Sequence, residues 1–202
     1  MNGVVLISGN GSNLQSIIDN AKSIDLNICC VVSNKKDAFG LKRAAKASIP
    51  FIALDETLFD SKLSFDQDIM KVIDNYQAEV IILAGYMRIL SADFISKYSG
   101  KILNIHPSLL PKFPGLNTHQ RAIDASEKKH GASVHFVTEE VDGGPVIAQQ
   151  FVNIDSTDNS QTLAKKVLEK EHVLYPQVIR WYTQGRLKLL NNKTVILDRK
   201  TI

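Results

Sequence analysis

The chain has 202 residues, which is enough for one substantial domain with its own hydrophobic core. Hydrophobic residues make up 44% and charged residues 22%, a composition that excludes a disordered chain, a collagen or a membrane array. The net charge of +3, from 24 basic and 21 acidic residues, is too small a surplus to indicate a nucleic-acid-binding protein, but it suits small anionic substrates.

Short β-branched runs alternate with longer amphipathic segments in the first half of the chain. Strands are predicted at residues 4–8, 26–33, 51–54, 79–84 and 101–105. Helices, in which apolar residues recur every three or four positions, are predicted at residues 14–21, 41–47, 63–76 and 93–98. This order predicts an α/β fold with a Rossmann-like, doubly wound, mostly parallel sheet, which binds ligands beyond the carboxyl ends of its strands.

The second half of the chain follows a different pattern. Two extended segments, residues 130–138 and 146–154, are joined by a loop at 139–145, which predicts an antiparallel C-terminal extension of the sheet. A long C-terminal helix follows, with N-cap candidates at 156–160 and an apolar stripe of Leu163, Val167, His172, Tyr175, Val178, Ile179 and Tyr182.

The amino-terminal run, the two cysteines and the last residues indicate the compartment and the form of the carboxyl-terminal end. The apolar run at residues 4–7 lacks a basic leader and closes at once in a polar turn, so it is neither a signal peptide nor a membrane span. The adjacent Cys29 and Cys30 allow neither a disulfide framework nor a metal-ligand spacing, and we expect both to be buried. We therefore expect a cytoplasmic protein. Its last residues are predicted to form a hairpin that turns at Asn191-Asn192.

A glycine-containing turn, residues 8–13, follows the first predicted strand and opens the first helix. Backbone N–H groups and the helix dipole would converge there on an anion such as a phosphate. The turn lacks the third glycine of a dinucleotide fingerprint and the Gly-Lys-Ser/Thr of a P-loop. Alternatively, the glycines only allow a tight turn, and Ser12 or Asn13 caps the helix. The two roles can coexist.

Asn104 and His106 stand at the end of the fifth predicted strand. Two residues apart, they point to the same side, where an amide donor beside an imidazole could stabilise an oxyanion. Pro107 then fixes the backbone that leaves the strand. The alternative is that the pair anchors a loop by hydrogen bonds.

Asp142 lies between the two extended segments and is followed by two glycines. Near His106 it would favour the charged imidazole, orient the ring and relay protons through water. It could equally be a plain turn aspartate, because spacing alone does not bring it to the histidine.

The other histidines point more weakly to function. His135 alternates with apolar residues on a strand and His172 lies on the helix stripe, so structural roles are expected for both. His119 and His130 flank loops. His119 follows Pro114 and could approach the site, but solvent exposure is the simpler expectation for it.

Four ordered motifs together resemble the folate-dependent phosphoribosylglycinamide formyltransferase family. They are residues 6–13 (LISGNGSN), 83–90 (LAGYMRIL), 104–111 (NIHPSLLP) and 131–147, and the resemblance covers residues 4–186. It implies the formyltransferase fold and transfer of a formyl group from 10-formyltetrahydrofolate to the amine of glycinamide ribonucleotide in purine biosynthesis. It implies no metal, and small-molecule partners only, with no nucleic acid or membrane, for a monomer or homodimer.

The resemblance also assigns site residues. It implies a catalytic trio of Asn104, His106 and Asp142, with the oxyanion held by Asn104 and protonated His106. It implies that glycinamide ribonucleotide is bound by Gly11, Ser12, Asn13 and Glu171, and that the folate is bound by Lys62, Met87, Arg88, Ile89, Leu90 and Asn104. Lys62 departs from the arginine that close bacterial relatives often carry, which keeps the charge but loses the bidentate geometry.

Within a single domain of residues 1–202, we expect a phosphate- and nucleotide-binding half at 1–107, a folate-side half at 108–190 and a tail at 191–202.

Three alternatives compete with the formyltransferase. A 10-formyltetrahydrofolate hydrolase uses similar chemistry, but such hydrolases carry an additional amino-terminal regulatory domain, whereas the first strand here begins within a few residues of Met1. A folate- or nucleotide-binding module would leave the trio unexplained. A Rossmann oxidoreductase would need the missing fingerprint.

Overall fold

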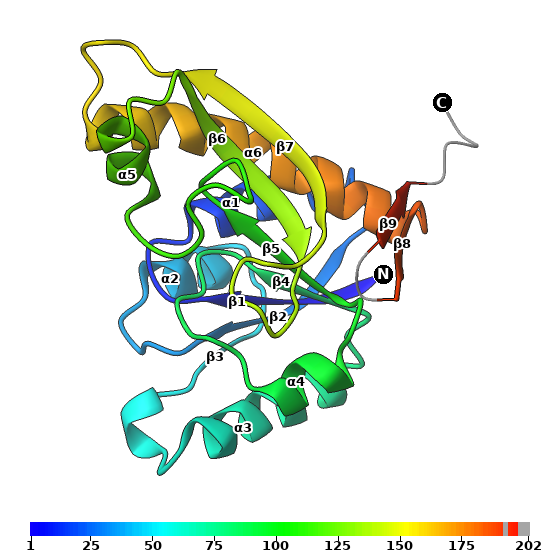
Figure 1. Ribbon diagram of the computed structural model, residues 1–202. Helices are drawn as coiled ribbons and strands as arrows, with labels where there is room; N and C mark the ends of the chain where they lie inside the picture. Colours follow the sequence, from blue (N-terminus) through cyan, green and yellow to red (C-terminus); the bar gives the residue numbers. More distant parts are fainter. Residues whose placement is uncertain (192–193, 198–202) are drawn as a thin grey trace.

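The computed structural model describes residues 1–191 and 194–197, and a seven-stranded sheet runs through its centre (Figure 1). The strand order is β3-β2-β1-β4-β5-β6-β7, in which β1 to β5 are parallel and β6 and β7 are antiparallel to their neighbours. The strands are β1 (Asn2–Ile7), β2 (Asn27–Ser33), β3 (Phe51–Ala53), β4 (Val80–Leu83), β5 (Ile102–His106), β6 (Lys129–Phe136) and β7 (Val146–Asn153). The predicted α/β architecture with an antiparallel extension is confirmed.

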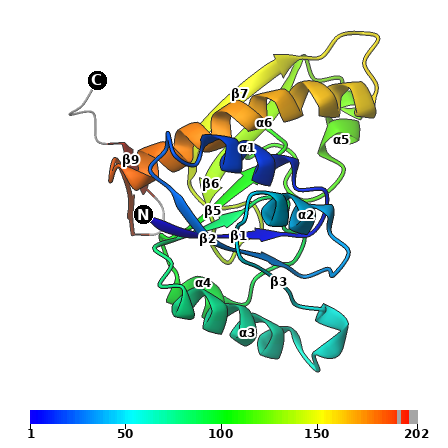
Figure 2. The same ribbon diagram turned by 180° about the vertical axis from the view of Figure 1, so that it is seen from behind.

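Helices cover both faces of the sheet (Figure 2). One face packs against α1 (Ser12–Asn20), α2 (Phe39–Lys46) and α6 (Ser160–Thr183), and the other against α3 (Lys62–Asn75) and α4 (Ala92–Lys97). Because both faces are covered, the central strand β4 is buried along its whole length, as its uninterrupted apolar sequence requires. The structure adds two short elements that the sequence pattern did not predict, α5 (Thr118–Asp124) and the 3₁₀ helix η1 (Glu56–Leu58).

The chain reverses direction across the sheet between β1 and β4. It builds outward from β1 through β2 to β3, and then returns to place β4 on the other side of β1. Such a switch point opens a crevice at the carboxyl ends of the two strands. The loops that leave these strands are tied together, because the N–H of Met87 donates to Ser8 Oγ over 2.8 Å.

The start of α6 follows the predicted capping region. Asn159 is the N-cap, and its side chain accepts hydrogen bonds from the N–H groups of Gln161 and Thr162. Most of the predicted stripe is buried, but His172 and Tyr182 are only half-buried. The hydroxyl of Tyr175 meets the carbonyl oxygens of Leu83 and Leu103, so α6 is held against β4 and β5.

The expectations for the cysteines and for the carboxyl-terminal hairpin can also be compared with the structure. Cys30 is buried as expected, whereas Cys29 is half-buried. The end of the chain contains an antiparallel pair, β8 (Leu187–Leu190) and β9 (Thr194–Leu197), as the hairpin prediction requires. Asn192 of the predicted turn lies outside the described residues.

A proline inside α6 joins that helix to α1. Pro176 has no N–H, so the carbonyl of His172, four residues earlier, loses its helical partner. Ser16 of α1 replaces that partner, since its hydroxyl donates to the His172 carbonyl over 2.7 Å. The bond fixes the middle of α1 against the middle of α6.

We predict that Ser16→Ala lowers the free energy of unfolding by about 1–3 kcal/mol, because it leaves a buried carbonyl without a donor. Urea denaturation monitored by circular dichroism measures the change. In a Pro176→Ala background the new N–H can bond the His172 carbonyl, so Ser16→Ala should cost less there. An equal cost in both backgrounds would contradict this account of the link.

Candidate active site

A cavity of about 550 Å³ opens at the carboxyl ends of β4 and β5. Its walls come from three segments: the loop after β4, the segment between β5 and α5, and the loop between β6 and β7. Apolar side chains dominate one part of the lining, and the polar groups of Asn104, His106, His135 and Asp142 stand together in the rest. Such a combination is typical of a small-molecule site.

The pairing of β5 with β6 brings four polar residues to one face of the sheet. Asn104 lies directly opposite His135, and His106 lies opposite Ser133. Asn104 and His106 therefore share a face, as the sequence predicts, and the neighbouring strand adds a second polar pair to it. The Nδ2 atom of Asn104 lies 3.1 Å from Nε2 of His135.

Both ring nitrogens of His106 have partners. Nε2 lies 2.9 Å from the carbonyl oxygen of Phe113, which can only accept, so Nε2 carries a proton. Nδ1 lies 3.3 Å from Oδ2 of Asp142. Burial lowers the pKa of the imidazole below its ordinary value, while the Phe113 carbonyl and the Asp142 carboxylate oppose that lowering. The carboxylate thus favours the charged ring, but burial outweighs it.

The loop between β6 and β7 carries Asp142 into the cavity from a distant part of the sequence. Its Oδ2 accepts the N–H of Gly115 over 2.8 Å, and the side chain is almost buried. Burial alone would raise the carboxyl pKa, but the Gly115 N–H and the His106 imidazole are among the contacts that lower it overall. Asp142 has a φ of +52°, which aspartate and asparagine tolerate better than most residues. Gly144 is required nearby, since a Cβ there would lie 1.8 Å from the carbonyl oxygen of Phe136.

The glycine turn forms the amino-terminal end of α1. Gly11 is the N-cap residue with a φ of +74°, and α1 begins at Ser12 without a side-chain cap. The suggestion that Ser12 or Asn13 caps the helix is therefore wrong. Because a Cβ on Gly11 would lie 2.7 Å from the Cα of Gly40, the turn packs directly on α2 and needs glycine at this position.

Glu171 of α6 meets this turn. The amide nitrogen of Asn13 donates to Glu171 Oε2 over 2.8 Å, across 158 positions of sequence. Burial raises the pKa of the Glu171 carboxyl, and the bond from Asn13 opposes the rise. The Oδ1 atom of Asn13 is buried and has no hydrogen-bond partner within the described residues. The turn and α6 therefore meet in one polar cluster, whose residues Gly11, Ser12, Asn13 and Glu171 are not part of the lining of the 550 Å³ cavity.

The residues predicted to contact folate lie in or beside the cavity. Met87 and Ile89 expose 66% and 59% of their surface, whereas Leu90 is buried, and all three line the cavity. Arg88 also lines it, but its guanidinium is paired with Glu56. Lys62 is not part of the lining. Its ammonium group donates to the carbonyl of Leu90 over 3.1 Å and so holds the end of the segment from Met87 to Leu90.

The structure places two further histidines in the lining of the cavity. His135 was expected to be structural, yet it lines the cavity and contacts Asn104. His119 was expected to be exposed, yet it is half-buried, lines the cavity and lies 3.2 Å from His130. A signal for His135 was present, because Ser133 and His135 repeat on β6 the spacing of Asn104 and His106 on β5.

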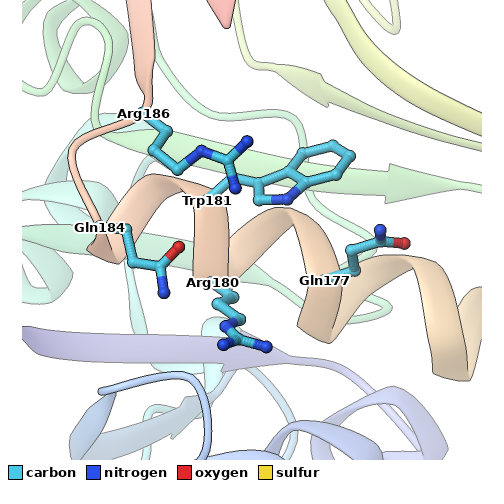
Figure 3. Close-up of a pocket in the computed structure, with 5 residues that line it drawn as sticks. All are labelled: Gln177, Arg180, Trp181, Gln184 and Arg186. Atoms are coloured by element: carbon cyan, nitrogen blue, oxygen red, sulfur yellow. The ribbon is translucent and has the colours of Figure 1, made fainter. Parts of the chain in front are cut away.

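A second hollow, of about 580 Å³, lies at the carboxyl-terminal end of α6 (Figure 3). Its lining contains two arginines, two glutamines and a tryptophan, namely Gln177, Arg180, Trp181, Gln184 and Arg186. No histidine or carboxylate is among these described residues, so the hollow lacks groups for acid–base chemistry.

Within the described parts of the chain, no cluster of three or more His, Cys, Asp or Glu residues could hold a metal. No helix in residues 1–191 is long and apolar enough to cross a membrane.

Comparison with known proteins gives a consistent result. The formyl transferase family profile matches residues 1–179. A phosphoribosylglycinamide formyltransferase of Escherichia coli (strain K12) is 52% identical over 194 residues, which cover 95% of this chain and 92% of the relative. The human trifunctional purine biosynthetic protein adenosine-3 is 40% identical over 190 residues, but these cover only 19% of that protein.

Solved structures share the whole fold. The phosphoribosylglycinamide formyltransferase of Coxiella burnetii superposes with a TM-score of 0.94 at 48% identity, covering 98% of this chain and 93% of the other. The glycinamide ribonucleotide transformylase 1 of Symbiobacterium toebii also gives a TM-score of 0.94, at 38% identity, covering 98% of this chain and 94% of the other.

We predict that Asp142→Asn lowers the pKa of His106 further. The carboxylate raises that pKa against burial, so its removal leaves burial less opposed. Asparagine tolerates the positive φ of this position, which keeps the loop in place. Histidine-ring NMR titration of the two proteins measures the shift. An unchanged or higher His106 pKa in the variant would show that Asp142 does not stabilise the charged ring.

Proposed function

The chain belongs to the formyl transferase family, and we propose that it transfers the formyl group of 10-formyltetrahydrofolate to the amine of glycinamide ribonucleotide. The products are formylglycinamide ribonucleotide and tetrahydrofolate, in purine biosynthesis. One observation carries the proposal: Asn104, His106 and Asp142 meet in one cavity at the carboxyl ends of β4 and β5. Relatives that match this chain along nearly its whole length carry the name of this enzyme.

The apolar part of the cavity suits the folate donor. The segment from Met87 to Leu90 offers apolar side chains and backbone groups at the carboxyl end of β4, where a flat heteroaromatic ring could lie. Lys62 would support this segment through the Leu90 carbonyl, and its charge would attract the donor's carboxylate tail. The proposed folate-side half, residues 108–190, contributes Asp142 to the opposite wall.

The glycine turn suits the acceptor's phosphate. The N–H groups of residues 11–13 begin α1, where the helix dipole favours an anion. Glu171 lies beside the turn and would bind polar groups of the acceptor. In this arrangement the proposed phosphate-binding half, residues 1–107, carries the turn, and α6 contributes one residue from the other half.

The reaction would begin when the acceptor's amine attacks the formyl carbon of the donor. A tetrahedral intermediate forms, and its oxyanion would accept hydrogen bonds from Asn104 and His106. Because Nε2 of His106 donates to the Phe113 carbonyl, Nδ1, which faces Asp142, would have to be protonated as well to donate to the oxyanion. Asp142, 3.3 Å from that atom, would stabilise the positive charge that the ring carries in this step.

Collapse of the intermediate breaks the bond between the formyl carbon and the folate nitrogen. The proton lost by the attacking amine must reach that nitrogen, and water bound to Asp142 would carry it. Holding both substrates in one crevice supplies the entropic part of the acceleration. The chemistry needs no covalent intermediate with the enzyme.

We expect the purified protein to release tetrahydrofolate from 10-formyltetrahydrofolate only when glycinamide ribonucleotide is present. A spectrophotometric assay with and without the acceptor measures this. Equal release without the acceptor would instead identify a hydrolase, and no release under either condition would favour a binding module.

We predict that Asn104→Ala and His106→Ala each lower kcat on the order of a hundredfold or more, because each removes a donor to the oxyanion. The melting temperature, followed by circular dichroism, should stay near that of the wild type, which separates a catalytic loss from unfolding. Near wild-type turnover of His106→Ala would refute the proposed mechanism.

A further inference from the structure

Pro145, the residue immediately before β7, leaves a carbonyl oxygen of β6 without its usual partner. The N–H of Phe136 donates to the carbonyl of Pro145 over 3.1 Å. In an antiparallel ladder, residues paired in this way return the bond through the partner's N–H, which proline does not have. The Phe136 carbonyl must therefore find another donor or remain unsatisfied inside the protein.

The imidazole of His135 supplies that donor. Its Nδ1 lies 2.8 Å from the Phe136 carbonyl oxygen, and a carbonyl can only accept, so Nδ1 carries the proton. In the neutral ring the other nitrogen, Nε2, is then an acceptor. The backbone of β6 thus selects one tautomer of a histidine that is only 2% exposed.

This tautomer determines how the amide of Asn104 is oriented. The Nε2 lone pair lies 3.1 Å from Asn104 Nδ2, which donates one of its two hydrogens to it. In the flipped amide, Oδ1 would face the same lone pair, and two acceptors would repel each other. The Nδ2 atom is consequently held in place with its second hydrogen still available.

We infer that His135 is a positioning residue for the reaction, which acts by holding the Asn104 amide with its N–H toward the formyl oxygen. The inference rests on the proposed function, because it needs Asn104 to serve the oxyanion. It also gives Pro145 a role: by withholding an N–H from Phe136, it fixes the tautomer of His135. Asp142 Oδ1 lies 3.7 Å from His135 Nε2, too far for a hydrogen bond that would compete with Asn104.

Two substitutions separate this role from simple packing. His135→Leu removes the acceptor, whereas His135→Gln can place a side-chain oxygen near the position of Nε2. We expect His135→Leu to lower kcat about tenfold or more, but by no more than Asn104→Ala does, with both KM values nearly unchanged. His135→Gln should recover much of the loss. Val134→Ala, the neighbouring β6 residue on the opposite face, is the matched control, and its kcat should stay near that of the wild type.

A double-mutant cycle gives the decisive result. If His135 acts through Asn104, then His135→Leu should cost little further turnover once Asn104 is already alanine. The same loss in both backgrounds, or wild-type kcat for His135→Leu, would overturn the inference.

A second measurement does not depend on activity. Ring ¹⁵N NMR of the wild-type protein should show His135 neutral and protonated on Nδ1. The Nε2-protonated tautomer would refute the inference even if His135→Leu failed to fold. If the wild-type protein shows no acceptor-dependent transfer, the proposed function fails instead, and the NMR result still decides whether the backbone selects this tautomer.

Discussion

The antiparallel pairing of β5 with β6 is the constraint on which the site depends. Its register sets Asn104 opposite His135 and His106 opposite Ser133, so one face of two neighbouring strands becomes polar inside an otherwise apolar sheet. A shift of β6 by one residue would turn Ser133 and His135 to the other face, away from Asn104 and His106. The same strand β6 leads into the loop that carries Asp142 back to His106. The proposed catalytic arrangement thus follows from one strand pairing and the turn that ends it.

The parallel half of the sheet supplies the proposed binding surfaces around this centre. The reversal of strand order between β1 and β4 opens the crevice, and the Ser8–Met87 bond ties the turn after β1 to the loop after β4. The long helix α6 packs on the sheet. Its Tyr175 hydroxyl donates to the Leu83 carbonyl of β4, and its Glu171 carboxylate accepts a hydrogen bond from Asn13 of the glycine turn. The two proposed substrates would therefore lie on a frame whose parts are fixed to one another.

Much of this architecture could be predicted, because β-branched runs and helical periodicity are local signals. The strands and main helices appear within a few residues of their predicted places, and alternation along a strand put Asn104 and His106 on one face. The meeting of Asp142 with His106 depends on how a loop folds back, which spacing does not encode. The apolar neighbours of His135 predict packing, and the side chain is indeed buried, but its contact with Asn104 depends on the partner strand, which spacing along one strand does not encode. The helix α5 is too short to leave a clear periodic pattern.

A crystal structure with glycinamide ribonucleotide and a stable carbonyl analogue of the formyl donor tests the central claim most directly. We predict that the carbonyl oxygen lies about 3 Å from both Asn104 Nδ2 and His106 Nδ1, with the phosphate on the N–H groups of residues 11–13. A carbonyl oxygen bound away from these two nitrogens would contradict the account.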